Sequence, residues 1–191
     1  MSSQNVAIED PREAIVGFIG PMRAFAFSLT RNNAAADDLV QDALVKAWKN
    51  IKSFQPGTNM QAWLFTILRN TFYSDRRRMK REVEDADGAM AARLSEKPRH
   101  DGVLAFDEFT RAFAQLPDEQ REALSLVGAS GFSYEEAAET CGVAIGTIKS
   151  RVNRGRARLV EMLKLDEGAL DTTDKVTLGI INASPAVRAA S

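Results

Sequence analysis

The sequence predicts an all-α protein of two small helical domains joined by a flexible linker. Apolar residues recur at helical spacing in successive stretches, and no alternating strand pattern interrupts them. Between residues 82 and 102 that periodicity is lost and acidic residues prevail. A length of 191 residues is compatible with one domain or two small ones. We therefore expect domains at 10–81 and 103–165, a linker at 82–102 and a disordered tail at 166–191.

The first domain is expected to begin with two short helices. Asp10-Pro11 is typical of a helix start, with a capping residue before a proline in the first helical position. Gly20-Pro21 is expected to end this helix and to begin another, which runs to about Leu29. After a turn at Arg31-Asn32-Asn33, a third helix is predicted from Ala34. Its broad apolar face carries Leu39, Val40, Ala43, Leu44, Ala47, Trp48 and Ile51.

A long basic helix completes the first domain. A polar loop at 53–59 precedes it, Asn59 is its expected cap, and the helix spans 60–81. Its buried side is predicted to hold Trp63, Leu64, Ile67, Leu68 and Phe72. Six cations crowd the far half, against the single acid Asp75, more than the helix dipole alone requires. Beside a loop that contains Phe54, they predict a platform for unpaired DNA. These cations are Arg69, Arg76, Arg77, Arg78, Lys80 and Arg81.

The second domain begins with an amphipathic helix at 103–116. Its expected buried side holds Leu104, Phe106, Phe109, Phe113 and Leu116. Pro117 should end it, and Asp118-Glu119 should start a further helix that ends near 128–131.

Residues 133–159 have the pattern of a helix-turn-helix. Ser133 is a good N-cap, and Gly142 can take the positive φ of a sharp turn. Small residues before that turn allow two helices to cross closely. An apolar stripe of Val143, Ile148, Val152 and Leu159 would hold the second helix down. In such a motif the second helix lies in a DNA major groove.

The outward side of that second helix is basic and polar. Lys149, Ser150 and Asn153 are suited to base edges, and the arginines to phosphates. The alternative is an ordinary helical hairpin with a solvated basic face. The joint occurrence of the turn glycine, the small residues and the one-sided charge favours DNA binding. The predicted contact residues are Thr147, Lys149, Ser150, Arg151, Asn153, Arg154 and Arg156.

Composition excludes several other classes of function. One cysteine and one histidine permit neither an internal disulfide nor a metal site, and Cys141 is expected to be a small buried filler rather than a redox sensor. No acid–base pair, nucleophile constellation or phosphate loop predicts an enzyme or a cofactor. The amino terminus lacks a secretory pattern, and the apolar stretch 14–29 is too short to span a bilayer. We expect a cytoplasmic protein.

Taken together, these stretches resemble a group IV (extracytoplasmic-function, ECF) sigma factor of bacterial RNA polymerase. The resemblance covers about 10–165. It rests on DDLVQDALVKAWKN (37–50), FQPGTNMQAWLFTILRNTFYSDRRR (54–78), LPDEQREAL (116–124) and the helix-turn-helix, in this order and spacing.

The resemblance implies three binding surfaces. The −35 promoter element would be read as duplex by the helix-turn-helix. The polymerase core would be bound by Asp37, Asp38, Leu39, Gln41, Asp42 and Trp48.

The −10 element would be captured by the loop at 54–60 and the helix after it, with Asn70 beside a flipped base. The residues implied for this element are Phe54, Asn59, Met60, Arg69, Asn70, Arg76, Arg77 and Arg78.

Details of the loop at 55–58, the linker and the tail are similar to the general-stress subgroup, which implies control by an anti-sigma factor. A sigma-like decoy that binds only the anti-sigma factor would be expected to lose its basic recognition helix. A free-standing repressor would leave the first domain unexplained. The sequence thus favours a promoter-specificity subunit.

Overall fold

The computed structural model describes residues 11–85 and 104–164, and these are helical apart from short turns. The first domain contains α1 (Pro11–Val16), α2 (Ile19–Thr30), α3 (Asn33–Lys49), a 3₁₀ turn η1 (Ile51–Ser53) and α4 (Met60–Asp85). The second contains α5 (Leu104–Ala114), α6 (Asp118–Leu124), a π-helical continuation η2 (Ser125–Ala129), α7 (Tyr134–Cys141) and α8 (Ile145–Leu163). The all-α, two-domain prediction is confirmed.

The break between the first two helices lies earlier than the sequence predicted. It falls at Gly17 and Phe18, and α2 begins at Ile19, so Gly20-Pro21 lies inside its first turn. The first four backbone N–H groups of a helix have no partner within it. A proline in the third position of α2 therefore removes no hydrogen bond.

Helix α3 starts one residue before the expected position. The side-chain oxygen of Asn32 accepts a hydrogen bond from the backbone N–H of Ala35 at 2.9 Å, so Asn32 is the N-cap. Most of the predicted apolar face is buried, but Trp48 is 60% exposed and does not belong to it. The buried residues of α3 are Ala36, Leu39, Val40, Ala43 and Ala47.

Helix α4 is capped as predicted and is longer than predicted. Oδ1 of Asn59 accepts the backbone N–H of Ala62 at 3.1 Å. The helix continues to Asp85, so 82–85 belong to it and not to the linker. No glycine or proline interrupts these residues, and an Arg78–Glu82 pair one turn apart supports them. The remaining linker residues and the tail at 166–191 lie outside the described residues.

The helix-turn-helix is present and begins at the predicted cap, and its second helix continues past Leu159 to Leu163. Ser133 caps α7 through a reciprocal capping box with Glu136, and Gly142 ends it at φ +65°. In α8, Ile148, Val152 and Leu159 are fully buried, as predicted.

The helices before this motif also follow the sequence. The α6–η2 segment ends at Ala129, close to the expected position, although the π-helical turn was not expected. In and after α5, Phe113 and Leu116 are buried and Phe109 is half-buried, while the side chains of Leu104 and Phe106 lie outside the described residues.

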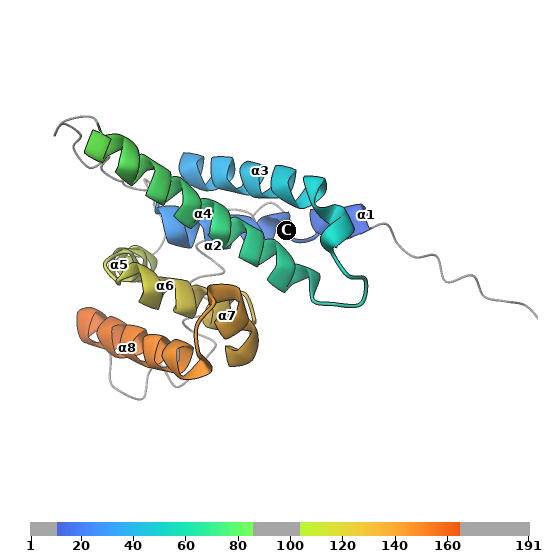
Figure 1. The fold of residues 1–191 in the computed structure, drawn as a ribbon. Helices are drawn as coiled ribbons and strands as arrows, with labels where there is room; N and C mark the ends of the chain where they lie inside the picture. The colour runs from blue at the N-terminus through green and yellow to red at the C-terminus, as the bar shows by residue number, and fades with distance from the viewer. Residues whose placement is uncertain (1–10, 86–103, 165–191) are drawn as a thin grey trace, which may run out of the picture.

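The two domains pack directly against each other through α2 and α4 on one side and α6, η2 and α7 on the other. Phe65 of α4 stacks on Phe25 with ring centroids 5.0 Å apart, and its other neighbour is Phe132 at 5.1 Å. The buried Arg121 of α6 donates through Nε to the carbonyl of Ser28 in α2. As Figure 1 shows, α3 and α8 lie on opposite outer sides of this packing.

Candidate nucleic-acid and polymerase surfaces

Helix α8 presents a cationic surface that no acid covers. Lys149, Asn153 and Arg154 are exposed, and Arg151 and Arg156 are partly exposed. Within the described part of the chain, none of these cations forms an ion pair. Lys149 is oriented by its own domain, because its Nζ lies 5.8 Å from the ring centre of Tyr134. The predicted duplex-binding residues are thus gathered on one open helix face.

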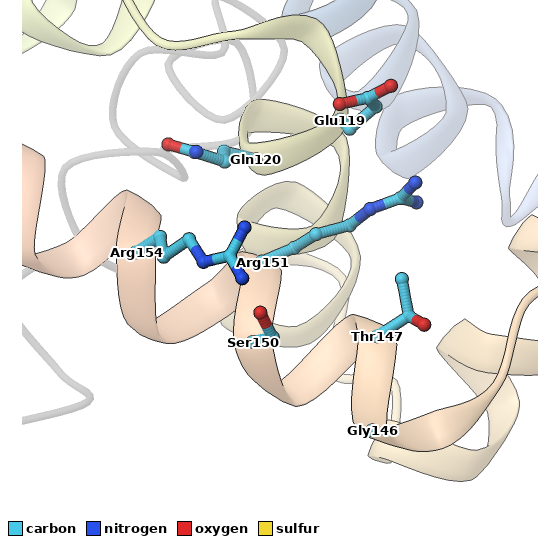
Figure 2. A pocket seen from close by; sticks show the side chains of 7 residues that line it. All are labelled: Glu119, Gln120, Gly146, Thr147, Ser150, Arg151 and Arg154. Atoms are coloured by element: carbon cyan, nitrogen blue, oxygen red, sulfur yellow. The ribbon is translucent and has the colours of Figure 1, made fainter.

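A groove between α6 and α8 extends this surface. Its volume is about 460 Å³, and Figure 2 shows Arg151 reaching from α8 toward the turn of α6 that carries Glu119. Oε1 of Gln120 is buried there without a protein partner. Arginine forks and hydroxyls are suited to phosphate oxygens. The groove is lined by Glu119, Gln120, Gly146, Thr147, Ser150, Arg151 and Arg154.

The loop and helix predicted for the −10 element are only partly open. Asn70, Arg77 and Arg78 are exposed on α4, and Phe54 packs on Trp63 with ring centroids 5.3 Å apart. Met60 is half-buried at the start of the helix.

Three other residues of that predicted surface, Arg69, Arg76 and Asn59, are bound by acids of the second domain. Nε of Arg69 donates to Oε1 of Glu122 at 2.8 Å, and the Arg69 guanidinium lies 4.7 Å from the ring centre of Tyr73. The Tyr73 hydroxyl donates to the other oxygen of Glu122 at 3.3 Å.

Arg76 forms an ion pair with Asp118 of α6, and it also lies over the ring of Phe72. Nδ2 of Asn59 donates to Oε1 of Glu136 at 2.6 Å. The two domains therefore meet across residues that the sequence predicts to touch DNA.

The electrostatics follow from this pairing. Burial raises the pKa of Tyr73 to about 12, and the Glu122 carboxylate adds to the rise. Burial acts to lower the pKa of Arg69, but Glu122 outweighs it and the pKa is raised. For Asp118, hydrogen bonds from Arg76 and Arg121 overcome the opposing effect of burial and lower the carboxyl pKa. All these shifts stabilise the ion pairs in their charged forms and the phenol in its neutral form.

The predicted polymerase surface on α3 divides into open and closed parts. Asp38, Gln41, Asp42 and Trp48 are exposed together, and Val45, which the sequence did not single out, is exposed beside them. Asp37 is engaged by Arg23 through two hydrogen bonds of 2.5 and 2.9 Å. Leu39 is only 6% exposed, so it packs in the core beneath this surface rather than on it.

Cys141 is the last residue of α7 and is buried. Burial raises the pKa of its thiol to about 12, with a further contribution from Glu122, which suits a packing role. Within 11–85 and 104–164 no cluster of potential metal ligands occurs, and no helix there is long and apolar enough to span a bilayer.

Comparison with known proteins agrees with this division into two domains. Residues 18–82 match the family model for sigma-70 region 2, and residues 106–159 match that for sigma-70 region 4. The chain is 58% identical over 160 residues to the ECF RNA polymerase sigma factor EcfG of Rhodopseudomonas palustris, covering 84% of this chain and 88% of that protein. This chain belongs to the ECF sigma factor family.

More distant relatives agree. The ECF sigma factor SigM of Bacillus subtilis is 30% identical over 145 residues, which is 74% of this chain and 88% of SigM. The sigma factor RpoE of Bartonella quintana, solved in complex with the anti-sigma factor NepR, matches with a TM-score of 0.74 and 50% identity. That match covers 84% of this chain and all of RpoE.

Sequence reasoning missed the residues that join the two regions of this ECF sigma factor. Glu122, Tyr73 and Phe65 were not singled out, yet Glu122 and Phe65 are fully buried at the contact. The local signal was limited to a carboxylate directly before the apolar Ala123 and Leu124. That signal did not identify its partner, because Arg69 lies 53 residues away.

Proposed function

We propose that this sigma factor directs the polymerase core to promoters through the three surfaces described above. The open face of α8 and its groove bind the −35 element as duplex. The loop before α4 and the outer side of α4 bind the melted −10 strand, and the exposed part of α3 binds the polymerase core. The chain acts as a specificity subunit in the cytoplasm and carries out no chemistry itself.

The observation that carries this proposal is the unpaired cationic face of α8 on a packed helix-turn-helix. Its side chains supply both point charges for phosphates and hydrogen-bonding groups for base edges, as duplex reading requires. A decoy that only captures an anti-sigma factor has no need of this face, so its presence favours a promoter-binding factor.

The −10 role is supported by the part of α4 that stays exposed. Asn70 lies one residue from Arg69 and is exposed to solvent, on the helix that follows the loop with Phe54. Extracting a base from the stack costs roughly a few kcal/mol. Hydrogen bonds in a polar pocket and stacking on an aromatic ring can offset this cost.

The polymerase-binding role of α3 is supported by an exposed apolar pair within an acidic face. Val45 and Trp48 are 52% and 60% exposed, unusual for large apolar side chains, and Asp38 and Asp42 lie near them. A partner with apolar and basic side chains on a rigid helix fits this composition.

Control by an anti-sigma factor completes the proposal. The similar RpoE chain was solved with the anti-sigma factor NepR, and the similar R. palustris protein is named EcfG. We infer that this chain is regulated in the same way and belongs to the general-stress subgroup.

The test is transcription by purified polymerase core, with and without this chain, on a pool of promoter fragments. Specific transcripts are expected only when the chain is present. Lys149→Ala should cost about 1–3 kcal/mol of −35 discrimination, and Asn70→Ala should impair melting with duplex binding intact. Arg158→Ala is the control, because it removes an exposed cation of α8 outside the predicted set. Absence of both transcripts and core binding would refute the proposal.

A further inference from the structure

Helix α6 forms one wall of the groove beside α8, and this wall carries hydrogen-bond acceptors. Glu119 and Gln120 lie on the α6 side, and Arg151 and Arg154 lie opposite them on α8. In Figure 2, Arg151 reaches toward the turn with Glu119, whereas the side chain of Gln120 lies toward the end of the groove that holds Arg154. The groove thus sets an acceptor of α6 opposite each of two arginines of α8.

Gln120 is the member of this wall whose acceptor is both buried and without a partner. Its Oε1 accepts no hydrogen bond within the described part of the chain, although the side chain as a whole is only half-buried. A buried acceptor that has lost water and gained no donor is unfavourable, and most buried polar atoms in folded proteins avoid that state. The oxygen of Gln120 is therefore ready to accept a hydrogen bond from a donor that enters the groove.

Close packing of α6 on α8 holds Gln120 beside Arg154. At Gly155, the next residue, an added Cβ would lie only 3.4 Å from Cβ of Gln120. The absence of a side chain at Gly155 therefore lets the stem of Gln120 approach the backbone of α8. Arg154 itself is exposed and forms no ion pair among the described residues, so its guanidinium is available as the donor.

A DNA phosphate would make this pairing favourable. An exposed arginine loses side-chain entropy when it is fixed, and one hydrogen bond to a neutral amide does little to offset that loss in water. The DNA major groove is about 12 Å wide and a helix with its side chains is about 10–12 Å across, so a helix in this groove turns its flanks toward the sugar-phosphate walls. A phosphate bound to one edge of the Arg154 guanidinium fixes the side chain and leaves other N–H groups for a second acceptor. The bond to Gln120 then forms at little additional cost.

We infer that Gln120 is a positioning residue for the −35 contact. In the DNA-bound chain its amide oxygen accepts a hydrogen bond from the Arg154 guanidinium and so holds the opposite edge of that group against a backbone phosphate. Helix α6 thus takes part in promoter binding through Arg154. This role rests on the −35 function proposed above for α8.

The test is a double-mutant cycle in the full chain, in which binding of a random-sequence DNA duplex is measured at several salt concentrations. Gln120→Met keeps the length of the side chain and removes the amide. It should lower duplex affinity about threefold to tenfold, the contribution of one hydrogen bond, and reduce the slope of log affinity against log salt, as Arg154→Ala does. It should change neither quantity in an Arg154→Ala background and keep its full effect in an Arg151→Ala background. Gln115→Met, at an exposed glutamine of the same domain, is the control and should bind as the unaltered chain does.

The free energy of unfolding separates positioning from packing. Because Gln120→Met removes an acceptor that has no partner in the unbound chain, the variant should be at least as stable as the unaltered chain. Lower stability with unchanged duplex binding would show that Gln120 serves the fold alone, and would overturn the inference. If Arg154→Ala weakens binding but Gln120→Met does not, the inference fails and the −35 role of α8 stands. If the unaltered chain binds no duplex, or Arg154→Ala binds it equally tightly, the proposed −35 function fails as well.

Discussion

Helices α4 and α8 both carry rows of cations, but the structure treats them differently. On α8 the cations face solvent, and the buried side of the helix is held by apolar contacts within its own domain. On α4, Arg69 and Arg76 are paired with acids that come from the other domain. A charge count along the sequence assigns both helices to nucleic acid equally, whereas the structure leaves the cations of α8 open and pairs two of those on α4 with the other domain.

The difference teaches that a basic surface is defined by its partners as much as by its charges. The α8 surface needs only its own domain to be correct, so it is the same whether the domains are together or apart. Part of the α4 surface depends on where α6 lies, because Glu122 and Asp118 pair with Arg69 and Arg76 on contact. Four changes would break or sharpen this contrast.

The largest effect is expected from Phe65→Ala. This ring is fully buried between Phe25 of its own domain and Phe132 of the other. Removing it should lower the free energy of unfolding by about 3–5 kcal/mol and also weaken the packing of the two domains on each other. Denaturant unfolding followed by circular dichroism measures the loss. Phe54→Ala, at a half-exposed loop position, is the control. An equal loss there would show that burial of the Phe65 ring between the two domains is not the cause of the effect.

A somewhat smaller effect is expected where α8 is docked on α6. A Cβ at Gly155 would lie 2.7 Å from Cδ1 of Leu124, a fully buried side chain with little room to move. Gly155→Val should therefore destabilise the second domain by about 1–3 kcal/mol and displace the cationic face of α8. At Gly146, on the same helix, no atom beyond the adjoining residues and the helix's own backbone lies within 4 Å of such a Cβ. Gly146→Val should be nearly neutral, so equal losses at the two sites would contradict the packing argument.

Phe65 and Gly155 mark the limit of what the sequence predicted. The helix-turn-helix was predicted in detail because its determinants are local: a cap at Ser133, a positive φ at Gly142 and an apolar stripe within one helix. The importance of Gly155 and Phe65 depends instead on which side chain arrives from elsewhere. Such contacts are set by packing between distant segments and leave no periodic signal.

The same reasoning applies to the binding surfaces. Periodicity placed Lys149 and Asn153 on the open side of α8 because the opposite side was recognisably apolar. Periodicity wrongly grouped Trp48 with the buried face of α3, because no local feature distinguishes an apolar side chain that is left exposed. It also began the linker at Glu82, although α4 continues to Asp85, because no local feature shows that the helix continues past its basic residues. The involvement of Arg69 with Glu122 was beyond reach, since it depends on the packing of two domains.

A third and smaller effect concerns the salt dependence of DNA binding. Arg151→Ala should reduce the slope of log affinity for duplex against log salt by about 0.9, the share of one phosphate contact. Glu122→Gln, which removes the charge that pairs with Arg69, should leave that duplex slope unchanged and steepen the slope for single-stranded DNA by about 0.7 for each cation released on α4. Titrations at several salt concentrations measure both. Glu139→Gln, an exposed acid of α7 outside the groove, corrects for the general effect of removing an acid, and a steeper single-strand slope in that control would remove the distinction.

The smallest effect, and the most direct report on the contact between α4 and α6, is the ionisation of Tyr73. The chain has two tyrosines, so Tyr134→Phe leaves Tyr73 as the only source of tyrosinate absorbance. With the two domains packed together, the pKa of Tyr73 is about 12, because burial and then the Glu122 carboxylate disfavour the phenolate. Because this pKa is raised, the neutral phenol stabilises the packing of the two domains. This contribution is complete at pH values below the ordinary pKa of about 10 and is lost as pH rises through about 12. Adding Glu122→Gln removes the nearby charge, so the titration midpoint should fall by the part that Glu122 contributes, while Glu119→Gln should leave it high. A midpoint near 10 with Glu122 in place would mean that Tyr73 is already in water, and that α4 is as open as α8.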